Sequence, residues 1–450
     1  MSSKFLGDKD PASLTYSAKL SLNENNNGFY QSHLMVFRPP INEKTLRDSD
    51  RLLWQAYNFF KNKLQKYFER NNNGETIAVF LNKLVAEKLM FIQIVVENEV
   101  SAYTVFETLN SRGVDLTVTD LLKNYLFSMA TSTDLVHIKE KWKRTVDAVG
   151  LDAFPAFLRH YWISKNKLIR QEYLFRAVKE VIKSSYHVID LLDDLEKNAQ
   201  LYNALTNSSD PFWIGQREQR KRVKELELFG ERQALPLLLA VYNNFNQDEF
   251  AKVLRIVSVI TFRYTVVSGR NTNPKEQAYS QAAIKVSHKE CLNAFSVAHE
   301  LRTLYVSDVD FRNDFSTLSI STKRKRKLAR YILFEIENHL SQADIDYEDN
   351  PATVEHILPE NSNGDWLDNF PASVQENYIY RIGNYALLEN DKNRDCGTKN
   401  FTEKKLIYQT SQYALARQVT ADEWTPNTLE KRQYRLAETA TSIWRIAQLD

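Results

Sequence analysis

Helical periodicity dominates the middle of this 450-residue chain. Apolar side chains recur there at three- and four-residue spacing, which is the pattern of amphipathic helices packed on a core. The segments with this pattern are 138–149, 154–163, 171–182, 186–206, 231–245 and 248–265. Glycine and proline, which interrupt helices, occur only 11 times each. The sequence therefore predicts a mainly helical chain.

Further elements are predicted on both sides of this region. Thr117 and Asp120 have the spacing of a helix cap and predict a helix from 117 to about 129. The Asn-rich stretch 23–28 predicts a loop. Other predicted helices are 50–70, 323–340 and 402–410, and the predicted strands are 353–357 and 385–388.

Cysteine content and hydropathy exclude several classes of protein. Cys291 and Cys396 are the only cysteines, so the chain cannot build a disulfide framework or a four-cysteine zinc site. No stretch approaches the roughly 20 apolar residues of a membrane span, and the start Met1-Ser2-Ser3-Lys4 lacks the apolar core of a secretory signal. We therefore expect a soluble cytoplasmic protein with no membrane contact, in which any metal binds oxygen and imidazole.

Positive charge is concentrated in two runs, although the formal net charge is only +2. The 217–224 run reads Arg-Glu-Gln-Arg-Lys-Arg-Val-Lys, and the 323–327 run reads Lys-Arg-Lys-Arg-Lys. Such clusters are typical of nucleic-acid binders, and also of solvated helix faces. The second run would begin a helix, where the helix dipole disfavours cations. Local conflicts of this kind often mark functional positions.

The segment 355–359, Glu-His-Ile-Leu-Pro, is followed by Gly383-Asn384 and by Asn393. Hydrolysis of a phosphodiester requires a base that deprotonates water and a cation that neutralises the phosphate charge. Glu355 and Asn393 could supply the oxygen ligands that Mg²⁺ prefers. His356 has a suitable side chain for the base. Asn384, on the facing strand, could brace the loop that carries His356.

Each of these residues also has an ordinary structural interpretation. A single Glu-His pair is usually structural or solvated, Asn384 fits a turn, and Asn393 fits a helix cap. Their order and spacing together favour a nuclease.

Residues 323–450 resemble the HNH, or ββα-metal, endonucleases and, within them, the DUF1524 domain. The resemblance rests on residues 354–361, 382–388, 390–393, 401–405 with Tyr408, and 424–444. It implies that His356 is the general base, that Asn384 is the structural amide of the catalytic site, and that Glu355 and Asn393 bind Mg²⁺ or Mn²⁺. The first ligand in the family is often Asp, so Glu355 is longer by one methylene.

The same resemblance places basic residues near the phosphate. The family has a basic residue at the position of Lys405, where phosphate contact is expected. We expect Lys392 and Arg394, which flank Asn393, to contact nucleic acid as well.

Residues 104–129 look like the central motif of the DUF262 family, and so do residues 157–162 and 263–273. That domain usually precedes DUF1524, as in the modification-dependent restriction enzymes of the GmrSD type, where it is associated with nucleotide hydrolysis and control of the nuclease. Arg112 and Lys123 could then meet phosphates. The family's early Asp-Gly-Gln-Gln-Arg motif is absent, and so is a Gly-x4-Gly-Lys-Ser/Thr loop. We therefore expect a DUF262-like domain that lacks its N-terminal half, which carries this early motif. The missing half would be supplied by a separate subunit or would have been lost by truncation.

Together these patterns predict a mainly α (α+β) protein with a helical DUF262-like domain at 1–315 and a DUF1524-like HNH nuclease domain at 316–450. The predicted function is metal-dependent cleavage of foreign or modified DNA in an antiviral restriction system. Two alternatives stay open. One is a non-catalytic subunit of a restriction complex that docks DNA or a partner, and the other is an RNase toxin.

Overall fold

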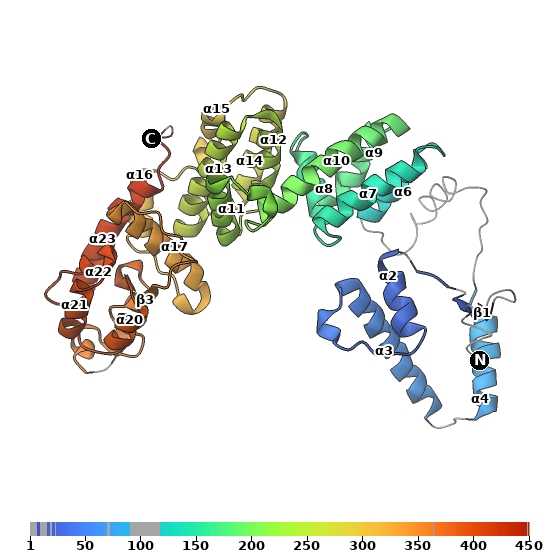
Figure 1. Cartoon of the computed structure of the whole chain (residues 1–450), viewed down its shortest axis with the longest axis horizontal. Coiled ribbons are helices and arrows are strands. Elements are labelled where there is room, and N and C mark those ends of the chain that lie inside the picture. Colours follow the sequence, from blue (N-terminus) through green and yellow to red (C-terminus); the bar gives the residue numbers. More distant parts are fainter. Residues whose placement is uncertain are drawn as a thin grey trace. The chain divides into compact units, whose positions relative to one another are not determined.

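The computed structural model (Figure 1) describes residues 7–9, 16–18, 20–22, 24–69, 73–90, 118–362, 364–447 and 449. The chain divides into two compact units, Met1–Val95 and Val96–Asp450. The described residues are mainly helical, which confirms the predicted class. The domain boundary predicted between residues 315 and 316 stays a prediction.

The first unit contains short helices and one small strand pair. Its elements are β1 (Gly7–Lys9), β2 (Tyr16–Ala18), α2 (Glu24–Phe29), η1 (Tyr30–Leu34), η2 (Glu43–Thr45), α3 (Asp48–Phe68), α4 (Gly74–Val79) and η3 (Phe80–Ala86). The helix predicted at 50–70 is confirmed as α3. The loop predicted at 23–28 is wrong, because most of this stretch forms α2. The Asn26 amide donates there to Ser49 (2.9 Å) and Asp50 (2.9 Å) at the start of α3, so tertiary contacts outweigh the local loop preference.

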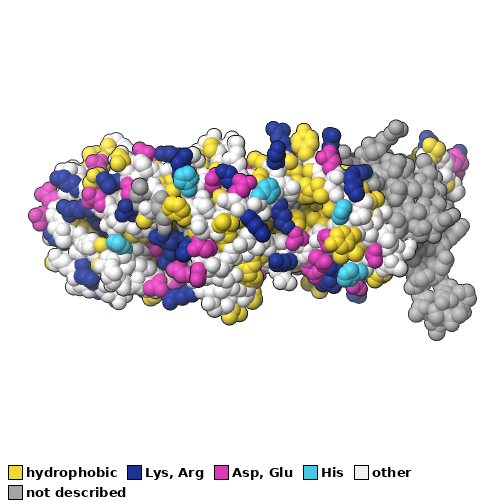
Figure 2. Space-filling view, turned by 90° about the horizontal axis from the view of Figure 1, so that it is seen from above, with side chains coloured by type: hydrophobic (Ala, Val, Ile, Leu, Met, Phe, Trp, Pro, Cys, Tyr) yellow, Lys and Arg dark blue, Asp and Glu magenta, His cyan; other side chains and the backbone are white. Residues whose placement is uncertain are grey.

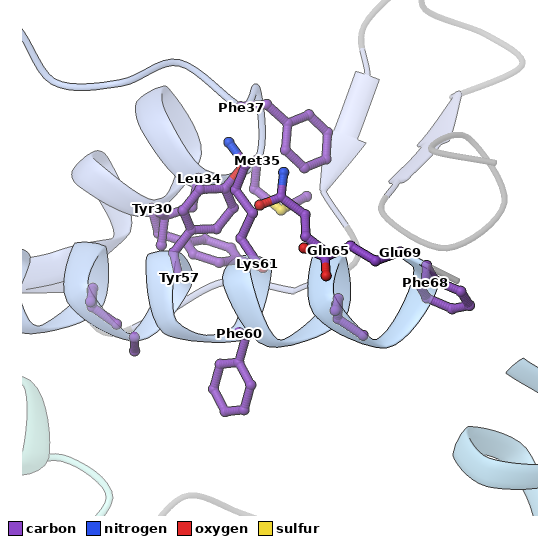
Figure 3. Close-up of a pocket in the computed structure, with 13 residues that line it drawn as sticks. Tyr30, Leu34, Met35, Phe37, Tyr57, Phe60, Lys61, Gln65, Phe68 and Glu69 are labelled. Atoms are coloured by element: carbon purple, nitrogen blue, oxygen red, sulfur yellow. The ribbon is translucent and has the colours of Figure 1, made fainter. Parts of the chain in front are cut away.

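A pocket of about 1000 Å³ lies in the first unit, between η1 and α3 (Figure 3). Tyr30, Leu34 and Met35 line it from η1 and the residue that follows, and Tyr57 and Lys61 line it from α3. The lining is mainly apolar and aromatic. None of the predicted site residues is among the described residues that line this pocket.

The second unit begins, in the described residues, with helices that pack on a common core. They are α6 (Val118–Ser128), α7 (Leu135–Val149), α8 (Phe154–Ile163), α9 (Leu174–Val181), α10 (Ser185–Thr206), α11 (Arg217–Phe229), α12 (Leu235–Asn244), α13 (Gln247–Thr261), α14 (Asn273–Ser287), α15 (Ala294–Glu300) and α16 (Asp308–Phe315). Shorter turns of helix are η4 (Gln171–Tyr173), η5 (Pro211–Trp213), η6 (Phe262–Val267) and η7 (Arg302–Leu304). The predicted helices of this region are confirmed, whereas the cap predicted at Thr117 lies outside the described residues.

The C-terminal part of the second unit holds the predicted strands. Its elements are α17 (Thr322–Ser341), β3 (Thr353–His356), α18 (Trp366–Asn369), α19 (Ala372–Ile379), η8 (Ile382–Asn384), β4 (Tyr385–Leu388), α20 (Asn390–Cys396), α21 (Phe401–Gln409), α22 (Ala414–Arg417) and α23 (Pro426–Ile443). β3 and β4 pair antiparallel, with Thr353 opposite Leu388 and His356 opposite Tyr385. In Figure 1, β3 lies beside α20, and the two elements are in contact.

The β3–β4 pair separates two hydrophobic cores. Tyr385 and Leu387 of β4 belong to a large core that extends from residue 122 to residue 446. Ala386 and Leu388 belong to a smaller core that also contains Tyr408. Successive side chains of a strand point to opposite faces. Neighbouring residues of β3 therefore also face different surroundings.

Charge is well mixed on the surface. In Figure 2, basic and acidic side chains are interspersed over the visible face, in keeping with the small formal net charge of +2. None of the described helices combines the length and the apolar character that crossing a membrane requires.

Candidate active site

Glu355 points from β3 into the smaller core and is 4% exposed. Its Oε1 accepts hydrogen bonds from Lys404 Nζ (2.7 Å) and the Tyr408 hydroxyl (3.0 Å). Burial raises the pKa of Glu355, and the Lys404 ammonium and the Tyr408 hydroxyl act in the opposite direction. The carboxylate therefore lies inside the protein and depends on an internal cation.

Lys404 is fully buried on α21. Besides its bond to Glu355, its ammonium donates to the carbonyl oxygens of His356 (2.9 Å) and Ile357 (3.2 Å). An ammonium has three donors, so all three are used. Lys404 therefore fixes both the carboxylate and the backbone at the end of β3.

The imidazole of His356 leaves β3 on the opposite face, toward the first turn of α17. Its Nε2 lies 3.2 Å from the hydroxyl oxygen of Thr322 and 3.7 Å from Oε1 of Glu360. The ring meets the Tyr385 ring edge-on, with 4.9 Å between centroids, and the side chain keeps 16% of its exposure. Burial lowers the pKa of His356 to about 4, although Glu360 raises it. The ring is therefore neutral at pH 7, and the side chain is partly exposed.

Asn384 is fully buried and braces the segment after β3. Its Oδ1 accepts from the Leu358 backbone N–H (2.8 Å) and from the Trp424 indole (3.2 Å). Its Nδ2 donates to the carbonyl oxygens of Leu358 (3.0 Å) and Ile379 (3.0 Å). Four hydrogen bonds thus connect one amide to three segments. The amide thus braces the segment that follows β3, and its part in catalysis stays a prediction.

Asn393 lies within α20. Its Nδ2 donates to the hydroxyl of Thr353 (2.8 Å) on β3. Thr353 and Glu355 are two residues apart on one strand and so share a face. Asn393 therefore approaches the face of β3 that carries Glu355. No hydrogen bond between the side chains of Glu355 and Asn393 occurs in the part of the chain that the structure describes.

The predicted phosphate contacts have varied surroundings. Lys405 bonds to Asp422 (3.2 Å). Lys392 donates to Glu389 (3.0 Å) and to the carbonyl oxygen of Thr410 (2.7 Å). Arg394 is exposed. The ammonium of Lys123 lies 5.7 Å from the centre of the Phe127 ring, and Arg112 lies outside the described residues.

Sequence reasoning missed Lys404 and did not assign roles to Thr322, Glu360 and Tyr408. Lys404 and Tyr408 are four residues apart on α21 and therefore share a helix face. A capping box formed by Asn400 and Glu403 fixes where α21 begins. The helix register alone could therefore have separated the inward Lys404 from the neighbouring Lys405.

Two family models match the chain. The N-terminal domain of the GmrSD restriction endonucleases matches residues 4–127, and the C-terminal domain of the same enzymes matches residues 305–439. The C-terminal match contains β3, β4, α20 and α21. The N-terminal match gives no support to the expected separate subunit that would supply a missing half. No curated protein matches the chain.

Proposed function

This chain belongs to the GmrSD restriction endonucleases, and from that membership we propose that β3, β4 and α20 form a ββα-metal finger that hydrolyses DNA phosphodiesters. Cleavage of foreign or modified DNA in antiviral restriction is the corresponding biological role. One observation carries the proposal. The imidazole of His356 lies partly exposed at the end of β3, with the Thr322 hydroxyl oxygen 3.2 Å from its Nε2.

His356 acts as the general base. A neutral imidazole has a lone pair that can take a proton from water, and this form of His356 is the dominant one at pH 7 because burial lowers its pKa to about 4. Tyr385 fixes the plane of the ring from the facing strand. Thr322 and Glu360 lie near Nε2 and can orient the attacking water.

Glu355 and Asn393 are proposed to hold Mg²⁺ or Mn²⁺. A carboxylate and a carboxamide oxygen are the hard donors that such ions prefer, with water and phosphate completing the shell. Both side-chain donors to Glu355 engage Oε1, and Asn393 uses its Nδ2 toward Thr353, so Oε2 and Oδ1 are the oxygens proposed for a cation. The described residues hold no cluster of three or more His, Cys, Asp and Glu that could bind a metal. When bound, the ion would neutralise charge on the phosphate and on the leaving oxygen.

The proposal is tested by incubating plasmid DNA with the full chain in Mg²⁺ or Mn²⁺, with EDTA as the metal-free reaction. His356→Ala should abolish cleavage and leave DNA binding unchanged. His160→Ala is the matched control, because His160 also has a pKa lowered to about 4 by burial but lies on α8 in the helical body. Cleavage by His356→Ala at the wild-type rate would refute the assignment.

The same experiment separates the alternative functions. A docking subunit would produce no metal-dependent nicks with any DNA. An RNase would cleave RNA in a parallel incubation and leave the plasmid intact. Each result would contradict a DNA endonuclease.

A further inference from the structure

The two basic runs, which look alike in the sequence, have different surroundings. Most cations of the 217–224 run are neutralised by nearby carboxylates. The ion pairs are Arg217 with Asp344, Lys221 with Glu335, Lys224 with Asp346 and Glu348, and Arg222 with Glu218 and Glu225. This run therefore contributes mainly to packing α11 against its neighbours.

The 323–327 run is exposed along its whole length. Its two ends pair loosely, Lys323 with Glu360 (3.5 Å) and Lys327 with Glu348 (3.3 Å). In the described part of the chain, the central cations 324–326 make no ion pair. Lys325 has non-helical backbone angles (φ −129°, ψ 43°), so the regular part of α17 begins after it. Arg326 lies in the first turn of that part, where the helix dipole disfavours cations. Arg324, Lys325 and Arg326 are therefore exposed cations on both sides of a kink in α17.

A hollow of about 600 Å³ adjoins the run and is lined by all five of its residues, together with residues 227–230, Thr265, Val266 and Leu328. The carboxylate of Glu227 in this lining accepts hydrogen bonds from the Ser208 backbone N–H (3.1 Å) and hydroxyl (2.8 Å). The Glu227 carboxylate is thus already hydrogen-bonded, and the unpaired cations of the run supply most of the charge around the hollow.

The run is continuous with the environment of His356. Thr322, which directly precedes the run, bonds to Nε2 of His356. Glu360 lies within 3.7 Å of His356 and 3.5 Å of Lys323, so the two share one carboxylate neighbour. The Lys323 ammonium and the His356 ring both lie against Tyr380. A polymer bound along the run would therefore reach the partly exposed side chain of His356.

We propose that the 323–327 run binds the sugar-phosphate backbone of DNA and delivers the scissile phosphodiester to His356. This inference rests on the proposed function and adds the surface that holds the substrate. Arg324, Lys325 and Arg326 supply the main contacts, because their charges are not already compensated. Contacts of this kind are independent of base sequence, so the run contributes binding affinity and positions the protein along the DNA. Other residues of the protein then recognise which DNA is to be cleaved.

The test compares two variants that each lose three positive charges. Arg324→Gln/Lys325→Gln/Arg326→Gln changes the unpaired cations, and Arg217→Gln/Lys221→Gln/Lys224→Gln changes paired ones. Binding of a short DNA duplex is measured in EDTA over a series of salt concentrations. Loss of three phosphate contacts should weaken binding on the order of 100-fold at about 0.1 M salt and reduce the salt slope by about 3. The 217–224 variant should bind within a few-fold of wild type.

Equal losses in both variants would overturn the inference, because affinity would then follow net charge alone. Tighter binding of an RNA duplex than of DNA would also overturn it. Circular dichroism checks the fold, and the three single substitutions replace the triple variant if it unfolds. Failure here is distinct from failure of the proposed function. If the wild type cleaves DNA but the 324–326 variant binds normally, only this inference fails. If binding depends on the run but the wild type never cleaves, only the proposed function fails.

Discussion

Glu355 and His356 show how a strand can give two neighbouring side chains opposite environments. The carboxylate points into the smaller core and meets an internal ammonium, whereas the imidazole points to the other face and is partly exposed. The alternation of side chains along β3 is sufficient to produce this difference. An acid and a base can therefore be adjacent in sequence without pairing with each other.

Replacing Lys404 with methionine should lower the free energy of unfolding by about 3–5 kcal/mol, because it leaves Glu355 as an uncompensated buried carboxylate. The measurement is urea unfolding at pH 7. The double variant Glu355→Gln/Lys404→Met should recover most of the loss, since it removes both charges.

Lys405→Met is the matched control on the same helix. Lys405 pairs with the fully exposed Asp422, so its loss should cost less than about 1 kcal/mol. Similar losses in Lys404→Met and Lys405→Met would contradict the internal role of Lys404.

At the scale of elements, the sequence predicted helices well where an apolar stripe faces a core and poorly where the helix is polar. The segments at 154–163 and 186–206 form α8 and α10 nearly as expected. In contrast, the residues of α11 were noted only as a basic run, and no helix was predicted at the position of α20. In α20 only Cys396 is buried, so there is no apolar periodicity to detect.

For the candidate site, the sequence predicted the two strands but not the side chains that contact Glu355 and His356. The strands predicted at 353–357 and 385–388 placed Glu355, His356 and Asn384 in one small unit. It did not show that Glu355 would pair with Lys404, or that Thr322 would reach His356. Those contacts depend on how α21 and α17 pack on the strands, which is set by tertiary structure and not by local propensity.

The approach of α23 to η8 depends on Gly383. A Cβ at this position would lie 2.7 Å from Cβ of Gln433 and 2.9 Å from the carbonyl oxygen of Leu429. Gly383→Ala should therefore push α23 away and lower the free energy of unfolding by about 1–3 kcal/mol. Thermal or urea unfolding measures the loss.

Gly28→Ala is the comparison, because a Cβ at Gly28 has no heavy atom within 4 Å and the residue lies in a helix. This change should be neutral or slightly stabilising. If Gly383→Ala is equally neutral, the close packing between η8 and α23 does not limit stability.

At the scale of the whole molecule, the large core of the second unit contains residues on both sides of residue 315. Arg263 illustrates this connection. It is fully buried and donates to the carbonyl oxygens of Val306 (2.8 Å) and of Thr441 (3.3 Å) on α23. The helical body and the C-terminal elements of this unit thus share buried polar contacts as well as apolar ones. We expect the second unit to unfold cooperatively.

The stability of this unit should depend on pH through His160, which lies beside Tyr202 with Nδ1 2.9 Å from the hydroxyl oxygen. Burial, with a smaller contribution from nearby Arg159, lowers the pKa of His160 from 6.5 to about 4. Between these values the unfolded chain binds more protons than the folded one, so stability is full above pH 6.5 and decreases as the pH falls toward 4. The decrease in the free energy of unfolding is up to about 3 kcal/mol, from 1.36 kcal/mol for each pKa unit.

His160→Gln removes this titration, while His356 stays the same in both proteins. The free energies of unfolding of wild type and His160→Gln should therefore converge or cross between pH 6.5 and 4, and parallel curves would show that His160 is protonated without cost to the fold.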